Sequence, residues 1–340
     1  MRKLGKQTIM LDTPPYILET SSIVGPKEAQ GPLAKYFDQC LEDEFWGEKT
    51  WEKAESKIIK ENVNSVIAKS GIPSNSIDYC FAGDLLNQCI SSSFGLRETN
   101  IPFFGIFGAC STFVEGMCLG SLFIDGGAAQ NVLCATSSHF CSAEKQFRFP
   151  LELGNQRPPS AQWTVTGSGA AIISKNNLNK ICPQITYVTP GKIVDMGVKD
   201  ANNMGAAMAP AALDTLITHL QDTGRKPSYY DAIITGDLGY IGKDILTEMA
   251  ETKGYNIKNN YNDCGVLIFD KDVQDTHSGG SGCGCVGSVF SGYFYKMLNE
   301  HKINRLLLIA TGALMNSTSS QQGESIPGIA HAVAIENLQK

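Results

Sequence analysis

The chain has 340 residues, of which 42% are hydrophobic and 18% charged, and its formal net charge is −6. A chain of this length buries roughly 75% of its unfolded surface without staples, and its eleven scattered cysteines are too few for a disulfide scaffold, which indicates reduced thiols in a cytosolic protein. The mild acidic balance, with no cluster of Lys and Arg, argues against nucleic acid as a partner.

The sequence shows no segment that is expected to enter or cross a membrane. Residues 1–10 lack the apolar core of a signal peptide. The longest apolar stretch, residues 306–315, is about half as long as a bilayer-spanning helix. These features predict a soluble α/β protein in which any membrane role is peripheral.

The first half of the chain begins with a helix signal followed by a strand signal. Thr50 is a typical N-cap for a helix with an apolar face over residues 54–67, and Gly71 and Pro73 are expected to end this helix. The apolar strand that follows belongs to the pattern Asp-x4-Gly-Asp-Leu at residues 78–85.

Three further elements complete this half. A second helix opens after Gly108 and ends near Gly126, and a strand at 131–136 follows it. Residues 167–173 then contain small residues that lead into an edge-type strand. Helices that alternate with short apolar strands are typical of a largely parallel sheet.

The same elements return in the same order in the second half. The pattern Asp-x4-Gly-Asp-Leu recurs at residues 231–238, after a helix that Pro210 is expected to open and Gly224 to end. The other counterparts are a helix that opens at 280–285 and strands at 304–311 and 328–335.

This repeat predicts two halves, residues 1–178 and 179–340, with a hinge in the polar stretch 175–180. Related by a pseudo-twofold axis, they would pack their central helices back to back between two sheets, giving one fused five-layered αβαβα sandwich. Ligands of open α/β sheets bind beyond the carboxyl ends of strands, near helix N-termini. The residues at such positions, two from each half, are Asp84, Cys110, Asp237 and Cys283.

Cys110 is the strongest candidate for chemistry. It lies among small residues at a predicted helix start, where N–H groups and the helix dipole favour a thiolate. The alternative is a buried thiol at a tight helix–strand contact. A nucleophile also needs a base, usually a histidine. The histidines considered are His139 after a strand end, His331 in an apolar strand, and His219 and His301, both expected at the surface.

Asp84 and Asp237 are related by the repeat and end equivalent strands. Such a pair suits general acid–base work, ligand orientation or contacts to calcium, whereas each aspartate alone also suits a helix N-cap or a loop buttress.

Two other motifs are weak. Residues 282–287 match Gly-x-Gly-x-x-Gly without a strand directly before them, and Cys283 and Cys285 lack a second pair of metal ligands.

The duplicated halves, with Cys110 opening the first buried helix, resemble the thiolase and ketosynthase fold. Over essentially its whole length the chain resembles, more specifically, the stage V sporulation protein AD family of spore-forming bacteria. The stretches that carry this resemblance are residues 25–28, 31–33, 82–88, 107–112, 135–139, 146–148, 164–169, 208–212, 262–265, 279–283 and 324–331.

The resemblance implies a non-enzymatic protein that binds dipicolinic acid (pyridine-2,6-dicarboxylate) and supports its uptake into the developing spore. It also implies a homodimer, peripheral to the spore inner membrane, that works with small integral membrane subunits. In ketosynthases a catalytic histidine stands where this chain has Asp237, and an asparagine stands where it has the loop 280–283. A cysteine without these two partners fits a fold retained for binding.

Dipicolinate carries two negative charges near pH 7, which Asp84 and Asp237 are expected to repel. Helix N-termini, a cation such as Arg148, or calcium bridging the ligand and the aspartates would compensate. No cofactor other than this calcium is expected. The residues predicted to line the ligand site are Asp84, Asn87, Cys110, Ser111, His139, Arg148, Ser168, Asp237, Ser281, Cys283 and His331.

Two other functions stay open at this point. One is an acyl-coenzyme A condensing or acyl-transfer enzyme with Cys110 as nucleophile, in which His139 or His331 should lie within hydrogen-bond reach of the thiol. The other is a structural subunit with a blocked cleft, which saturating dipicolinate would not stabilise.

Overall fold

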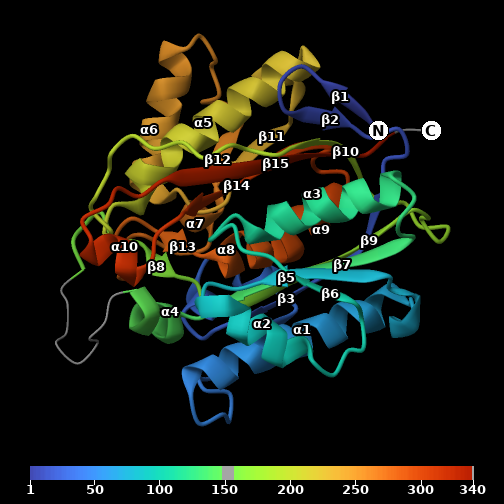
Figure 1. Cartoon of the computed structure of the whole chain (residues 1–340), viewed down its shortest axis with the longest axis horizontal. Coiled ribbons are helices and arrows are strands. Elements are labelled where there is room, and N and C mark those ends of the chain that lie inside the picture. The colour runs from blue at the N-terminus through green and yellow to red at the C-terminus, as the bar shows by residue number, and fades with distance from the viewer. Residues whose placement is uncertain (148–156, 339–340) are drawn as a thin grey trace.

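The computed structural model describes residues 1–147 and 157–338, and these form five alternating layers of helices and sheets (Figure 1). Upward through Figure 1 lie the helices α1 (Trp51–Ser70) and α2 (Ile90–Leu96), the first sheet, the central helices, the second sheet, and the helices α5 (Met204–Thr223) and α6 (Gly239–Thr252). This αβαβα order confirms the predicted fold class. None of the helices in the described residues is long and apolar enough to cross a bilayer.

The two sheets repeat one strand arrangement. The first has the order β3 (Tyr16–Val24), β9 (Gly167–Ser174), β7 (Asn131–Ser138), β5 (Tyr79–Gly83) and β6 (Phe103–Gly105). The second has the order β10 (Gln184–Thr189), β15 (Gly328–Glu336), β14 (Arg305–Ala313), β11 (Ala232–Thr235) and β12 (Tyr261–Asp263). In both sheets the first three strands pair antiparallel and the last three pair parallel. The sheets meet where β3 and β10 pair at Tyr16 and Gln184.

Shorter elements connect these layers. The strands β8 (Trp163–Thr164) and β13 (Gly280–Ser281) pair in parallel and link the two halves beside the predicted cleft. The other short elements are β1 (Arg2–Leu4), β2 (Thr8–Met10), β4 (Gln39–Cys40), α4 (Phe140–Phe147), α7 (Cys264–Leu267) and α10 (Ser317–Gln321).

The outer helices follow the predicted capping signals with one exception. Thr50 caps α1 with its side chain, and Gly71 ends this helix in the left-handed conformation. The helix α5 ends at Gly224 as predicted, but it begins earlier than predicted and encloses Pro210. It does so because the Asn203 side chain caps its first turn and the intervening Met and Ala residues are good helix formers.

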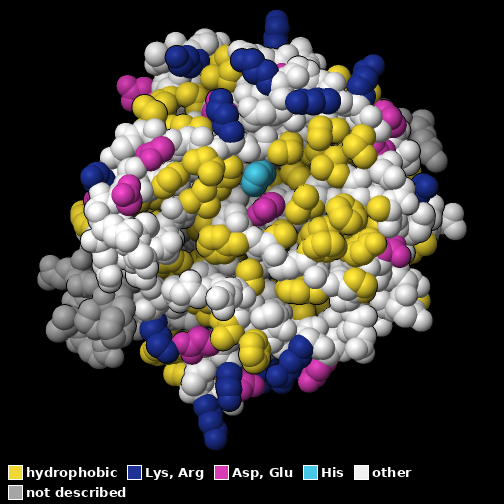
Figure 2. Space-filling view, in the orientation of Figure 1, with side chains coloured by type: hydrophobic (Ala, Val, Ile, Leu, Met, Phe, Trp, Pro, Cys, Tyr) yellow, Lys and Arg dark blue, Asp and Glu magenta, His cyan; other side chains and the backbone are white. Residues whose placement is uncertain are grey.

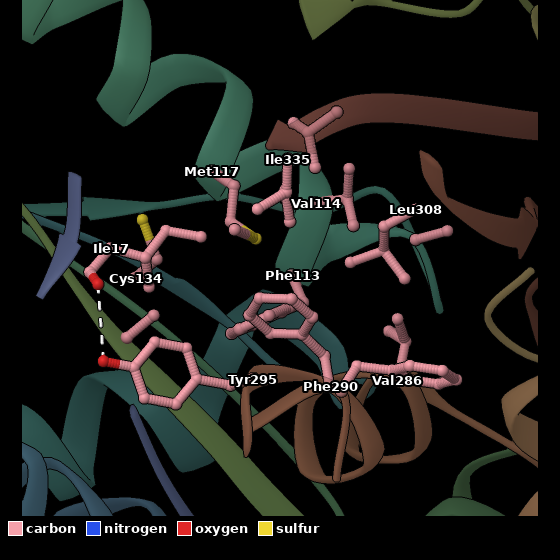
Figure 3. Packing of buried hydrophobic residues seen from close by; sticks show 14 of the residues in the cluster. Ile17, Phe113, Val114, Met117, Cys134, Val286, Phe290, Tyr295, Leu308 and Ile335 are labelled. Carbon is pink, nitrogen blue, oxygen red and sulfur yellow. Dashed lines mark hydrogen bonds between the residues drawn. The ribbon is translucent and has the colours of Figure 1, made fainter. Parts of the chain in front are cut away.

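The central layer consists of α3 (Thr112–Asp125) and α8 (Cys283–Val289), which continues through a π-helical turn at Phe290–Phe294 into α9 (Tyr295–Asn299). Figure 3 shows Phe113 of α3 packed against Phe290, with residues of both sheets around them. The backbones approach closely, because a Cβ at Gly169 of β9 would lie 2.0 Å from the Gly287 carbonyl carbon. The main core therefore surrounds two helices that both sheets cover.

The structure corrects two details of the sequence interpretation. The strands β9 and β15 are interior rather than edge-type, since each has a neighbour on both sides. His219 is buried rather than at the surface, because it bonds Thr189 at 2.8 Å and Tyr230 at 2.6 Å, whereas His301 is exposed as predicted. The division at residues 178 and 179 stays a prediction.

All eleven cysteines are free thiols, and seven of them are buried.

Candidate functional site

Cys110 lies two residues before α3, at a sharp turn. Ala109 has a positive φ of 50°, and the Ser111 hydroxyl donates to the Gly108 carbonyl at 2.7 Å. The Cys110 side chain is buried, with its Sγ 4.0 Å from the Ser281 Oγ. Burial and the nearby Asp237 raise the pKa of the thiol well above its ordinary value. The thiol rather than the thiolate is therefore the resting form.

Asp237 faces Cys110 from the second half of the chain. It follows β11, is fully buried, and accepts hydrogen bonds from the Thr311 Oγ1 at 2.6 Å and the Gly282 N–H at 3.2 Å. Burial raises the pKa of this carboxyl to about 7, although hydrogen bonds from Thr311 and Cys110 oppose the effect. The place where the resemblance puts a histidine base thus holds a carboxyl group bonded to the thiol.

Two buried side chains that the sequence interpretation missed hold this loop. Asp263 accepts hydrogen bonds from the Thr235 hydroxyl at 2.7 Å and from two backbone N–H groups in 238–239, both at 2.9 Å. The Gln162 Nε2 donates to the Asp237 carbonyl at 2.6 Å and the Gly280 carbonyl at 3.0 Å. Asp263 lies in a stretch that carries the family resemblance, whereas no local signal marks Gln162.

The Asp84 side chain stabilises the loop that follows it. Its carboxylate accepts hydrogen bonds from the Leu86 N–H at 2.9 Å and from the Ser92 N–H and hydroxyl, both at 2.7 Å. The buried Glu55 of α1 lies close by and accepts from the Ser142 hydroxyl at 2.7 Å. Burial raises the pKa of both carboxyls, and the charge of Asp84 raises that of Glu55 further. The Asp84 oxygens are thus occupied by donors of their own loop.

Ser281 and Cys283 bring the start of α8 to the same place. The Cys283 thiol donates to the Ser137 carbonyl at 3.0 Å, and burial raises its pKa well above the ordinary value. Cys283 also packs with Cys110 and Leu85 in one buried cluster. The fold therefore brings together Cys110, Asp237, Ser281 and Cys283, which come from both halves as the repeat predicts.

The two candidate histidines are directed at backbone groups. The Nε2 of His139 lies 2.8 Å from the Glu44 carbonyl, and its Nδ1 accepts from the Cys141 N–H at 3.2 Å. The Nδ1 of His331 accepts from the Gly191 N–H at 3.1 Å. Burial lowers the pKa of His139 and that of His331, the latter to about 4. Within the described residues, the side-chain partners of the Cys110 thiol are Asp237 and Ser281, not a histidine.

The other predicted site residues lie apart from Cys110 or serve local structure. Ser168 of β9 accepts from the Asn62 amide at 3.0 Å inside the first half. Asn87 lines a separate surface hollow together with Ser142 and Lys145. Arg148 lies outside the described residues.

A small cavity opens above Cys110. Its polar lining consists of Cys110, Thr164, Ser281 and Glu144, and the other lining residues are apolar. Its volume is about 40 Å³, which is room for about three water molecules. Among the described residues, no Lys, Arg or His lines it, and no group of three His, Cys, Asp or Glu is arranged to hold a metal ion.

The sequence matches the family described as Stage V sporulation protein AD (SpoVAD) over residues 5–336. It is 43% identical to Stage V sporulation protein AD of Bacillus subtilis (strain 168) over 336 residues, which cover 99% of this chain and 98% of that protein.

Solved structures with a similar fold are much more distant in sequence. The 3-oxoacyl-[acyl-carrier-protein] synthase III of Aquifex aeolicus VF5 matches with a TM-score of 0.57 and 13% identity over 95% of this chain and 99% of its own. Human mitochondrial 3-ketoacyl-CoA thiolase in complex with CoA matches with a TM-score of 0.59 and 12% identity over 97% and 100%. These likenesses establish a thiolase-like fold.

Proposed function

Because the chain belongs to the stage V sporulation protein AD family, we propose that it binds dipicolinic acid in the cavity above Cys110 without transforming it. In this role it works at the spore inner membrane with small integral membrane subunits and supports uptake of the ligand into the developing spore. The ligand and the role come from the family resemblance. The observation that favours binding over catalysis is the burial of Cys110 beside the Asp237 carboxyl, because burial and then this carboxyl raise the pKa of the thiol and so favour its protonated form.

The lining of the cavity suits an aromatic ring that bears carboxylates. Phe107, Phe147 and Met315 offer apolar, polarizable contacts to a ring. The hydroxyls of Thr164 and Ser281 are the lining groups that can donate hydrogen bonds to a carboxylate. Apolar walls with a few polar groups are the usual composition of a small-molecule site.

The carboxyl beside Cys110 favours a ligand whose own charge is neutralised. Asp237 is fully buried and interacts with the Cys110 thiol that lines the cavity, so a carboxylate there would repel the free dianion. We therefore propose that the ligand arrives as its calcium chelate, with the metal brought by dipicolinate. A contact between Asp84 and this calcium stays a prediction, and it would compete with the hydrogen bonds that the Asp84 oxygens accept from Leu86 and Ser92.

Acyl transfer through Cys110 is the second candidate function. A cysteine beneath an apolar cavity favours it, since several proteins of similar fold are acyl synthases or thiolases by name. The raised pKa of the thiol opposes it, because the thiolate is the nucleophile. Mass spectrometry after incubation with acyl-coenzyme A distinguishes the two functions, since an acyl adduct on Cys110 would support transfer.

Thermal unfolding with dipicolinate and calcium tests the proposal. We expect the ligand to raise the melting temperature of the wild-type protein, because a ligand that binds only the folded state stabilises it. Cys110→Leu should abolish this rise by filling the cavity, whereas Cys118→Ala, which alters a buried thiol elsewhere on α3, should retain it. No rise in the wild-type protein, or an equal rise in Cys110→Leu, would refute binding at this cavity.

A further inference from the structure

The helix α4 forms one wall of the cavity above Cys110. Ala143 and Phe147 of α4 line the cavity, and Phe147 packs onto the buried cluster that contains Cys110 and Cys283. The cavity holds about 40 Å³, whereas sites for small molecules usually start at roughly 300 Å³. Any aromatic dicarboxylate therefore requires one of the walls to move.

The N-terminal end of α4 is firmly held. The Phe140 ring stacks on the Trp163 ring with their centroids 3.6 Å apart and their planes at 6°. The Phe140 N–H donates to the Thr166 hydroxyl at 3.1 Å, and the preceding His139 bonds the Glu44 carbonyl at 2.8 Å. This end can serve as a fixed pivot.

Polar contacts also hold the rest of α4, and those described next join it to α1, besides the contact of Cys141 with Glu44 and an interaction of Glu144. The Ser142 hydroxyl donates to the buried Glu55 at 2.7 Å. The Lys145 Nζ lies 2.7 Å from the Glu52 carboxylate, and because half of the Lys145 side chain is exposed, this ion pair contributes little. The Phe147 side chain, only half-buried, is the last apolar contact of the helix with the cavity.

The other walls of the cavity are held by stronger structure. Phe107 follows Ile106, whose N–H donates to the Ala82 carbonyl of β5 at 3.0 Å. A Cβ at Gly83 would lie 2.1 Å from the Ile106 carbonyl oxygen, so the two backbones are in direct contact. Met204 begins the long helix α5, and the segment before Met315 bonds back through the Leu314 N–H to the Pro327 carbonyl at 2.8 Å. Moving α4 therefore breaks weaker contacts than moving any of these other walls, so we expect α4 to open with the smallest free-energy change.

We propose that α4 is a movable wall that pivots at His139–Phe140, and that the Phe147 side chain is the plug that controls access to Cys110 and the size of ligand admitted. The identity of the ligand rests on the proposed function. Access to Cys110 does not, and a thiol reagent can measure it in the absence of dipicolinate.

The rate at which iodoacetamide alkylates Cys110, followed by peptide mass spectrometry, tests this wall. We expect Phe147→Ala to raise the rate at least about tenfold, and Lys145→Met to raise it by a much smaller factor because the exposed ion pair contributes little, although both favour local opening. Lys258→Met is the control, since it breaks a similarly short ion pair of an equally exposed lysine, with Glu251, away from the residues that line the cavity. The exposed Cys40 gives an internal reference in each sample. Rates within about twofold of the wild type in both α4 variants would overturn the proposal.

A reversible crosslink that holds α4 against α1 gives the complementary test, because it prevents the motion that the substitutions favour. Cysteines introduced at Glu52 and Lys145 can be joined by a short cleavable bismaleimide, after the four exposed or half-buried native cysteines have been replaced by serine. We expect the crosslinked protein to alkylate at Cys110 more slowly than the unlinked one, and cleavage to restore the rate. Equal rates before and after cleavage would overturn the movable wall, whereas failure of dipicolinate binding alone would leave it standing.

Discussion

The thiol of Cys110 and the carboxyl of Asp237, which lie in opposite halves of the chain, interact in the buried interior. A carboxyl in this position acts on the thiol in the opposite sense to a histidine base. Its negative charge disfavours the thiolate, whereas an imidazolium would favour it. Together with burial, this relationship favours the protonated thiol of the cysteine at the head of α3.

Asp237→Asn should make the Cys110 thiol more reactive. The substitution removes the carboxylate that raises the pKa of the thiol but keeps a group of similar shape. We expect the apparent pKa of Cys110 to fall, although burial still raises it, so that alkylation between pH 8 and 9 becomes several-fold faster. Alkylation rates measured across this range check the effect, with Asp214→Asn on α5 as a control far from Cys110. Superimposable pH–rate profiles for the wild type and Asp237→Asn would contradict it.

Calcium should increase the affinity for dipicolinate. The free ligand brings two negative charges next to the buried Asp237 carboxyl, whereas the chelate brings no net charge. Isothermal titration with and without calcium should therefore show tighter binding of the chelate. Magnesium is a useful control, since it demands a smaller octahedral shell than calcium. Equal affinities for the free ligand and the chelate would refute this prediction.

Glu28 should make the protein less stable as the pH rises. Its side chain is fully buried, with Oε1 bonded to the Thr166 N–H at 3.0 Å, and burial raises its pKa to about 8 from an ordinary 4.5. The folded protein therefore binds more protons than the unfolded chain between these values, and the stability present below about pH 4.5 is lost as the pH rises towards 8.

Glu28→Gln should remove the contribution of Glu28 to this pH dependence, while Glu55 and Asp237, whose pKa values burial also raises, keep theirs. A shift of this size corresponds to a loss on the order of 3–5 kcal/mol in the wild type between pH 4.5 and 8. Urea denaturation of both proteins at pH 5, 6.5 and 8 measures the difference in the free energy of unfolding, and the exposed Glu324→Gln serves as a control. A difference between wild type and Glu28→Gln that stays constant over this range would show that Glu28 is not protonated in the folded state.

Much of the fold follows from local signals in the sequence. The pattern Asp-x4-Gly-Asp-Leu marks β5 and β11, whose shared place in the two sheets shows the duplication directly. Caps such as Thr50 and Gly71 predict the ends of α1 because they act within one turn of the helix. Pro210 predicts the wrong start for α5, because a proline marks a helix start only when no better cap precedes it. Here Asn203 is that cap.

The site was predictable only in part, because distant segments form it. The repeat brings Cys110 and Asp237 together, but it also suggests that Asp84 is equivalent to Asp237, whereas its oxygens hold the turn before α2. Gln162 reaches the loop after β11 from 75 residues away, so no local pattern marks it. His219 is likewise buried by a partner on β10, which the periodicity of its own helix does not show.

The outer edge of the first sheet is the surface where we expect a second copy of the chain. The edge strand β6 exposes Phe103 and Phe104, and Phe107 follows them, also exposed. Figure 2 shows that hydrophobic side chains gather in a band across the middle of the molecule, in the region where Figure 1 places α3 and β6, whereas Lys and Arg lie mainly over the outer helices. An unpaired apolar edge strand is a template for pairing with another chain.

Gly105→Pro should therefore convert a dimer into a monomer. The Pro102 carbonyl and the Ile106 N–H bond β5, so the alternation of a strand directs the N–H groups of residues 103 and 105 outwards, toward the partner. Proline at 105 removes one outward donor and spares the bonds to β5. Light scattering coupled to size exclusion should show a dimer for the wild type and for Phe94→Asp, which changes an exposed side chain on α2, and a monomer for Gly105→Pro. A wild-type monomer, or a Gly105→Pro dimer of unchanged stability, would exclude β6 as the interface.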